Sequence, residues 1–194
     1  MLNFKPVVML KVCFFCAILF SFCNLSGQDF DFYKENITME IGEGYFHVNG
    51  IYYLKNKRSE VKTLVYPFPV DPLYGKVDSV YIFNLKTNEI IEPLKTDVNS
   101  AVFKIDFSTH NELAVQVSYR QELINSRAEY ILESTIAWKK PLDQANYQLI
   151  VPNSIELIKF SIPPGDSSVY DDERIYFWEE SNYMPPGNLV FDFY

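Results

Sequence analysis

Apolar and polar residues alternate in short runs along most of this chain, and that period of two limits the possible folds more than any other feature. Phe103, Ile105 and Phe107 share one parity, whereas Lys104 and Asp106 share the other. Successive side chains of a β-strand point to opposite faces of a sheet, so this run predicts a strand with one buried face. Aromatic residues make up 16% of the chain, and they suit a pleated surface better than a helix.

Two pairs of such runs predict β-hairpins. Residues 101–107 and 113–119 flank the polar segment 108–112, which contains the ordinary turn residues Ser, Thr, His and Asn. Residues 77–85 and 89–94 flank a second short polar turn. We therefore expect the two runs of each pair to lie side by side in one sheet.

Similar runs recur along the rest of the chain at intervals typical of an all-β protein. Further strands are expected over residues 45–54, 62–66, 129–138, 147–151, 155–162, 174–179 and 189–193. One short helix is predicted over residues 141–145, where Pro141 suits a first helical turn. Strands at intervals of about 8 to 12 residues, without amphipathic helices between them, favour an antiparallel β-sandwich, immunoglobulin-like or related.

The first part of the chain, residues 1–27, has the layout of a secretory signal peptide. Lys5 and Lys11 accompany an apolar run over residues 12–22, which is shorter than the roughly 18 residues that a membrane-spanning helix needs. Gly27 provides a small residue just before a polar stretch, so we expect cleavage after it. An uncleaved membrane anchor is the alternative.

All three cysteines lie in this leader. Cys13 and Cys16 have the spacing of a redox or metal motif, but cleavage would remove them. A lipoprotein acylated at Cys23 is a further alternative, although the bulky Phe22 precedes that cysteine. The mature chain is therefore expected to contain no thiol and, after cleavage, no integral membrane segment.

The chain after the leader divides into two predicted parts. Residues 28–124 form an N-terminal β-sandwich part, and residues 125–194 form a C-terminal β part packed on it. A polar break at residues 125–127 separates them. The two parts form either one sandwich or two packed β subdomains. Asp29 and Asp31 are expected in an N-terminal tail.

The overall charge argues against nucleic acid as a partner. The chain has 17 Lys and Arg residues against 25 Asp and Glu residues, a formal net charge of −8. Phosphate contacts need a surplus of Lys and Arg, which this chain lacks. No nucleic-acid binding is expected.

Side chains that carry most catalytic and metal chemistry are sparse. His47 falls in an aromatic strand and His110 in a turn, and no Gly-x-Ser-x-Gly motif provides a nucleophile. Asp171, Asp172 and Glu173 form the densest acidic group, but they lack the spacing of a calcium loop and cannot flank a scissile bond as one contiguous run. We expect a solvated loop there, no metal or cofactor, and no enzymatic activity.

Aromatic residues beside predicted loops and strand ends are the remaining candidates for a functional site. An exposed group of planar rings could stack on sugar rings or anchor a protein partner, whereas core packing is the alternative. The candidates are Tyr74, Trp138, Tyr170, Trp178 and Tyr183.

Several segments resemble a known group of proteins. They are Leu54-Lys55-Asn56, Val65-Tyr66-Pro67-Phe68-Pro69, Phe103-Lys104-Ile105-Asp106-Phe107 and the run from Glu112 to Gln121. Over residues 38–124 the chain resembles secreted bacterial β-sandwich domains of unknown function, and more distantly the vault/inter-α-trypsin-type domain. The segment from Trp138 to Leu189 is similar to the C-terminal half of the same secreted proteins. The resemblance implies a β-sandwich fold and no catalytic residue.

These features together predict an exported, non-enzymatic β-sandwich in the periplasm, on the cell surface or in the medium. It would act by protein or glycan recognition or have a structural role. One alternative is a small outer-membrane β-barrel, which the terminal Tyr194 fits but which the charge of Asp192 on the same face opposes. The other is a glycosidase-type hydrolase whose two acids come from distant strands.

Overall fold

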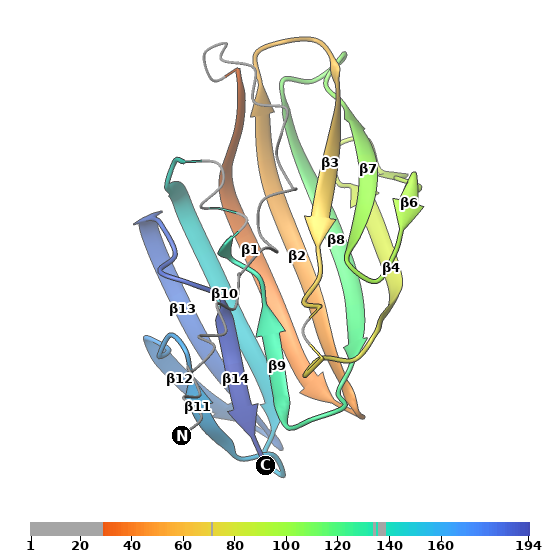
Figure 1. Cartoon of the computed structure of the whole chain (residues 1–194). Helices are drawn as coiled ribbons and strands as arrows, with labels where there is room; N and C mark the ends of the chain where they lie inside the picture. The colour runs from red at the N-terminus through yellow and green to blue at the C-terminus, as the bar shows by residue number, and fades with distance from the viewer. Residues whose placement is uncertain (1–28, 71, 134, 136–138) are drawn as a thin grey trace, which may run out of the picture.

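The computed structural model describes residues 29–70, 72–133, 135 and 139–194 (Figure 1). Most of them lie in strands of one eight-stranded sheet and two three-stranded sheets, which confirms the predicted all-β sandwich. The predicted leader, its three cysteines and the expected cleavage position lie outside the described residues. Among the described residues, no helix has both the length and the apolar character needed to cross a membrane.

The eight-stranded sheet forms one complete layer and has two free edges, so it does not close on itself. Its spatial order is β12-β13-β10-β1-β2-β8-β4-β5. The strands are β1 (Phe30–Gly42), β2 (Tyr45–Asn56), β4 (Val77–Asn84), β5 (Glu89–Ile90), β8 (Glu112–Glu122), β10 (Leu142–Pro152), β12 (Asp166–Tyr170) and β13 (Glu173–Tyr183). Neighbouring strands run antiparallel except β1 and β10, which run parallel.

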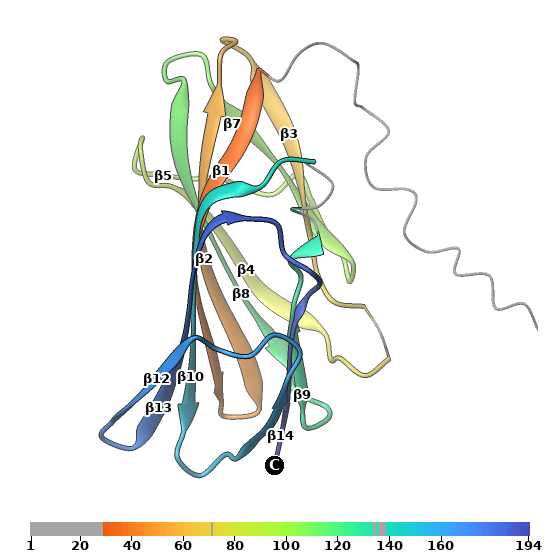
Figure 2. The same ribbon diagram turned by 90° about the vertical axis from the view of Figure 1, so that its left-hand side faces the viewer.

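Two small sheets share the second layer (Figures 1 and 2). One has the order β3-β7-β6 and the other β11-β14-β9. Their strands are β3 (Val61–Pro67), β6 (Lys95–Thr96), β7 (Ser100–Asp106), β9 (Arg127–Tyr130), β11 (Leu157–Phe160) and β14 (Leu189–Phe193). Figure 1 shows the edge strands β3 and β9 toward the middle of this layer. We call the place where these two edges face each other the seam.

The core lies between the two layers and follows the alternation of the sequence. On β8, Leu113, Val115 and Val117 are at most 3% exposed, and the residues between them face outward. On β7, Phe103 and Ile105 are buried with the same parity. The predicted parity of both runs is therefore confirmed.

The pairing predicted for these two runs is wrong. β7 pairs with β3 and β6, whereas β8 pairs with β2 and β4 in the opposite layer. Residues 107–111 therefore connect the two layers and do not close a hairpin. Alternation reports which side chains are buried, and two strands that face each other across a sandwich bury theirs just as hairpin partners do. The second predicted hairpin is confirmed, because β4 pairs with β5 through Phe83 and Ile90.

The N-terminal tail expected around Asp29 and Asp31 is in fact the start of the long strand β1. This strand lies between β2 and β10 in the middle of the large sheet. Its register shifts between Phe32 and Lys34, so the buried parity changes along the strand. A β-bulge of this kind, followed by the buried charged residue Glu35, hides the alternation that marks an ordinary strand.

Other predicted elements differ at their ends. Residues 142–145 are not helical but begin β10, because pairing with β13 and β1 overrides the weak local preference for a helix turn. The strand expected over residues 129–138 ends at Tyr130. The exposed turn at Asp171 and Asp172, between β12 and β13, confirms the solvated acidic loop. The predicted boundary near residue 124 falls between β8 and β9, and the large sheet takes strands from both sides of it.

Candidate functional site

A cavity of about 90 Å³ lies inside the sandwich at the seam between the two small sheets. Its walls come from both layers, with β1, β2 and β8 on one side and β3, β7 and β9 on the other. Most of the lining side chains are apolar or aromatic. An apolar cavity with a few converging polar groups is the usual form of a small-molecule site.

Three tyrosine hydroxyls meet at this cavity and join the three sheets. The Tyr52 hydroxyl of β2 lies 2.7 Å from the Tyr66 hydroxyl of β3 and 2.7 Å from the Tyr130 hydroxyl of β9. Burial raises the pKa of each phenol well above 10. The three groups therefore remain neutral and can donate or accept hydrogen bonds.

A glycine makes room for the central tyrosine of this chain of hydroxyls. Gly50 lies two residues before Tyr52 on the same face of β2, and both residues face the interior. A Cβ atom at Gly50 would collide with the Tyr52 ring. Gly50 therefore positions Tyr52, since any larger residue would displace the ring from the other two hydroxyls.

A buried carboxyl group forms part of the same wall. Glu35 of β1 pairs in register with Tyr52, lines the cavity and is 2% exposed. The Tyr147 hydroxyl of β10 donates a hydrogen bond of 2.5 Å to Glu35 Oε1. Burial raises the pKa of Glu35 to about 7, and the hydrogen bond from Tyr147 opposes that rise. No Lys, Arg or His of the described residues forms an ion pair with this carboxyl.

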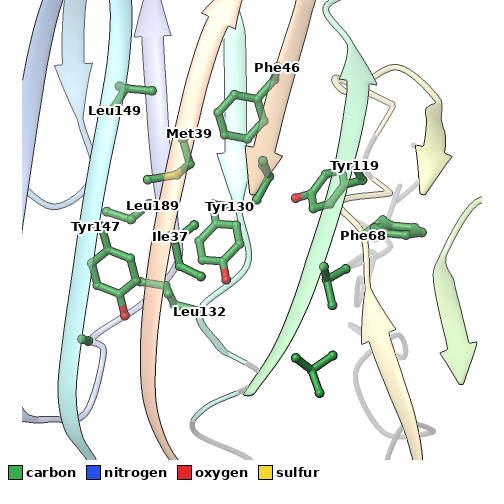
Figure 3. Packing of buried hydrophobic residues seen from close by; sticks show 14 of the residues in the cluster. Ile37, Met39, Phe46, Phe68, Tyr119, Tyr130, Leu132, Tyr147, Leu149 and Leu189 are labelled. Carbon is green, nitrogen blue, oxygen red and sulfur yellow. The ribbon is translucent and has the colours of Figure 1, made fainter. Parts of the chain in front are cut away.

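Aromatic rings form a continuous lining around these polar groups. Figure 3 shows Tyr130 and Tyr147 among the buried side chains, and their ring centroids are 6.5 Å apart. The Tyr52 ring contacts Phe32 at 5.9 Å and Tyr66 at 5.6 Å. The site therefore presents ring surfaces, neutral hydroxyls and one carboxyl group to the same small space.

The aromatic residues predicted as a recognition surface do not gather into one patch. Trp178 is 3% exposed and packs on Phe160 and Phe191, and its Nε1 donates to the Ile162 carbonyl at 3.1 Å. Its place is in the core. Tyr170 is 69% exposed on the edge strand β12.

The remaining candidates lie elsewhere. Tyr74 is partly buried, and its hydroxyl accepts a hydrogen bond of 3.2 Å from Arg127 Nε. The Tyr183 ring lies 6.2 Å from that of Tyr147, so it adjoins the Glu35 site without lining the cavity. Trp138 lies outside the described residues.

Sequence reasoning missed the residues that form this site. Glu35 and Tyr147 belong to strands whose pairing is parallel and distant in sequence, and Glu35 occupies an inward position on a strand that was not predicted. The only available signal was a lone acid within an apolar alternation, at Glu35, Ile37 and Met39. The alternation at Glu35, Ile37 and Met39 can be recognised as inward-facing only once the bulge between Phe32 and Lys34 is known.

A second hollow, of about 380 Å³, lies at the N-terminal end of β1 and is lined mainly by charged residues. Most of its charges are already paired: Lys140 with Asp31, Lys55 with Glu112 at 3.3 Å, and Asp29 with Arg58 at 2.6 Å. In the part of the chain that the structure describes, no group of three His, Cys, Asp or Glu side chains could hold a metal ion. The cavity at the seam is therefore the better candidate site.

Comparison with solved structures finds the fold in other proteins. A candidate nutrient binding protein from Legionella pneumophila subsp. pneumophila strain Philadelphia 1 has a TM-score of 0.66 and 13% identity, over 86% of this chain and 67% of that chain. A variant of a two-domain M1 zinc metallopeptidase bound to L-tryptophan has a TM-score of 0.51 and 10% identity, over 85% of this chain and 43% of that chain. This chain thus spans less than half of the peptidase, and at such identities the likeness concerns the fold alone.

Comparison of the sequence with known families and curated proteins finds no relative. No protein family model matches the chain, and no curated protein matches it. The resemblance to secreted β-sandwich domains and to the vault/inter-α-trypsin-type domain stays a prediction.

Proposed function

We propose that the chain is an exported, non-catalytic binding protein that takes a small, largely apolar ligand into the cavity at the seam. The observation that carries this proposal is the convergence of the Tyr52, Tyr66 and Tyr130 hydroxyls and the Glu35 carboxyl on one apolar cavity. Apolar walls supply most of the affinity in such sites, and the few polar groups orient the ligand.

The acid content of the cavity supports binding more than hydrolysis. Glycoside hydrolysis needs two carboxyl groups about 5 to 10 Å apart. Glu35 is the one acid among the described residues that line the cavity, and its polar neighbours are neutral tyrosines. A binding role also agrees with the name of the Legionella protein of similar fold.

Export is supported by the layout of residues 1–27. Lys5, Lys11 and the short apolar run favour cleavage after Gly27 and a final location in the periplasm, at the surface or in the medium. The intact mass of the exported protein tests this. A mature chain that begins at Gln28 is expected, and a chain that retains its leader or carries an acyl group at Cys23 would contradict it.

A second candidate function is glycan recognition on the outer face of the large sheet. There, Gln116, Asn49 and Ser118 form a hydrogen-bonded amide and hydroxyl network, and the Tyr81 and Phe83 rings are stacked at 6.1 Å. Such side chains resemble those that bind sugar hydroxyls and ring faces. Saturable binding to a glycan array that is lost in Tyr81→Ala would favour this surface.

A cavity-filling variant tests the proposed function. The purified protein would be titrated with isobutanol, isobutylamine and isobutyrate, and binding followed by two-dimensional NMR and by the thermal midpoint. Leu64→Phe would fill the cavity, whereas Val61→Phe adds the same ring bulk at an exposed position of the same strand. We expect at least one compound to bind saturably to the natural protein and to Val61→Phe but not to Leu64→Phe. If no compound binds, or if binding survives in Leu64→Phe, the cavity is not the site.

A further inference from the structure

We infer that the ligand of this cavity carries a small organic cation, an alkylammonium group, which the Glu35 carboxylate and the surrounding aromatic rings would hold together. This inference rests on the proposed function and names its ligand class. The reasons are the uncompensated charge of Glu35, the chemistry of the rings around it and the size of the space.

Within the described part of the chain, no basic side chain pairs with the Glu35 carboxylate. A carboxylate removed from water is costly unless a cation or several hydrogen bonds compensate it. Glu35 is 2% exposed, and the hydrogen bond from Tyr147 is a single neutral donor. A ligand cation in the cavity would supply the missing compensation.

The groups that face Glu35 from neighbouring strands are neutral phenols. They are Tyr52 of β2, Tyr66 of β3, Tyr130 of β9, Tyr147 of β10 and Tyr183 of β13. Burial keeps the pKa of all five well above the physiological range. They therefore add neither a competing cation nor a second anion. Since the pKa of Glu35 is about 7, the carboxyl carries its charge at pH 8 and would carry it at lower pH once a cation is bound.

The rings provide the second half of the site. Phe32, Tyr52, Tyr66, Phe103, Tyr119 and Tyr130 all line the cavity. The face of an aromatic ring attracts a cation, and sets of rings that enclose a methylated ammonium are a common means of recognition. Hydroxyl oxygens of the tyrosines can also accept hydrogen bonds from a primary ammonium group.

Elsewhere the chain itself pairs cations with tyrosine rings. On the outer face of the large sheet, Lys55 Nζ lies 4.1 Å from the centre of the Tyr33 ring, and the Arg120 guanidinium lies 4.4 Å from that of Tyr45. Among the described residues, none of the Tyr52, Tyr66, Phe103, Tyr119 and Tyr130 rings at the cavity has such a partner from the chain. The described residues thus give the cavity its rings and its anion but no cation.

The size of the cavity limits the cation. A cavity of about 150 Å³ accommodates benzene. The space at the seam, about 90 Å³, therefore suits a group of about three or four heavy atoms, such as a trimethylammonium head or the branched end of an alkylammonium ion. A longer ligand would have to extend between β3 and β9.

Matched ligands of equal shape test the inference. At pH 8, the affinities of isobutylammonium, isobutanol and isobutyrate for the natural protein would be measured by calorimetry. We expect the cation to bind at least about tenfold more tightly than the alcohol, and the anion to bind weakest. In Glu35→Gln the preference for the cation should disappear while the alcohol still binds. Glu40→Gln, which neutralises an exposed acid on the same strand, should leave the preference unchanged.

The outcomes separate this inference from the proposed function. If isobutanol binds as tightly as the cation and is excluded by Leu64→Phe, the cavity is a site but not one for cations. If the preference persists in Glu35→Gln, the counter-ion is another group. Circular dichroism would verify the fold of Glu35→Gln. Should that variant not fold, Glu35→Asp, which keeps the charge, must retain a preference for the cation, and its loss there would overturn the inference.

Discussion

The two faces of the large sheet use tyrosine in opposite ways, and the contrast is sharpest on β2. Tyr53 faces outward, where Lys34 lies 5.1 Å from the centre of its ring and Asn36 donates to its hydroxyl. Tyr52, the preceding residue, faces inward and bonds to two other tyrosines beside Glu35. Adjacent residues thus belong to two different chemical environments.

This difference explains which face is free to bind a ligand. On the outer face, the rings of Tyr33, Tyr45 and Tyr53 are partnered by cations of the chain itself, and Arg120 also pairs with Asp78 at 2.6 Å. The inner rings enclose a cavity and a carboxyl group that has no cation among the described residues. The same residue type therefore takes part in ion and ring contacts on one face and lines the proposed binding site on the other.

The largest expected effect comes from packing on the inner face. Phe46 is fully buried and its ring lies 6.1 Å from that of Phe191, so Phe46→Ala should reduce the free energy of unfolding by about 3–5 kcal/mol. His47, the next residue, faces outward, and His47→Ala should change it by no more than about 0.5 kcal/mol. Urea denaturation measures both. Equal shifts of the two midpoints would show that the faces are assigned wrongly.

The next effect concerns the charge of Glu35 and depends on pH. Its pKa is about 7 in the folded protein and 4.5 ordinarily, so the folded state binds the proton more tightly. The contribution of the protonated group is therefore complete below about pH 4.5 and is lost as the pH rises through about 7. The shift corresponds to about 3 kcal/mol.

Glu35→Gln resembles the protonated form at every pH. It should match the natural protein in stability at pH 4 and exceed it by up to about 3 kcal/mol at pH 8. Denaturation at a series of pH values measures the difference, and Glu40→Gln serves as the exposed control. A constant difference between natural protein and Glu35→Gln across the series would mean that Glu35 does not titrate as described.

The smallest of these effects concerns single hydroxyl groups. Tyr52→Phe leaves the Tyr66 and Tyr130 hydroxyls without their shared partner, so we expect a loss of about 1–3 kcal/mol. Tyr53→Phe removes one partly exposed hydrogen bond from Asn36 and should cost less than about 1 kcal/mol. Thermal unfolding of both variants measures the ratio. If Tyr53→Phe cost as much as Tyr52→Phe, the inner hydroxyl chain would have no special role.

The sequence predicts the strands and their buried parity better than their partners. Burial of Val115, Val117, Phe103 and Ile105 follows from alternation alone, because each strand has one face toward the core. The pairing of β7 and β8 with different sheets could not be predicted this way, because it depends on which layer each strand joins. Similarly, the position of Trp178 beside a predicted strand end suggests a recognition residue. Its contacts with Phe160 and Phe191 place it in the core.

The candidate site was the least predictable part. It unites β1, β2, β3, β9 and β10, so its residues are distant in sequence and meet only through the sheet order. The strand that carries Glu35 is itself hidden by the bulge after Phe32. A polar residue at an inward position lowers the strand signal just where a binding site needs it.

The most direct test of the contrast between the two faces is a crystal structure of the protein soaked with isobutylamine at pH 8. The account predicts density for the ligand inside the cavity at the seam, with its nitrogen about 3 Å from a carboxylate oxygen of Glu35 and within about 6 Å of a ring such as that of Tyr52. An empty cavity, or ligand bound instead beside Tyr45 or Tyr53 on the outer face, would contradict it.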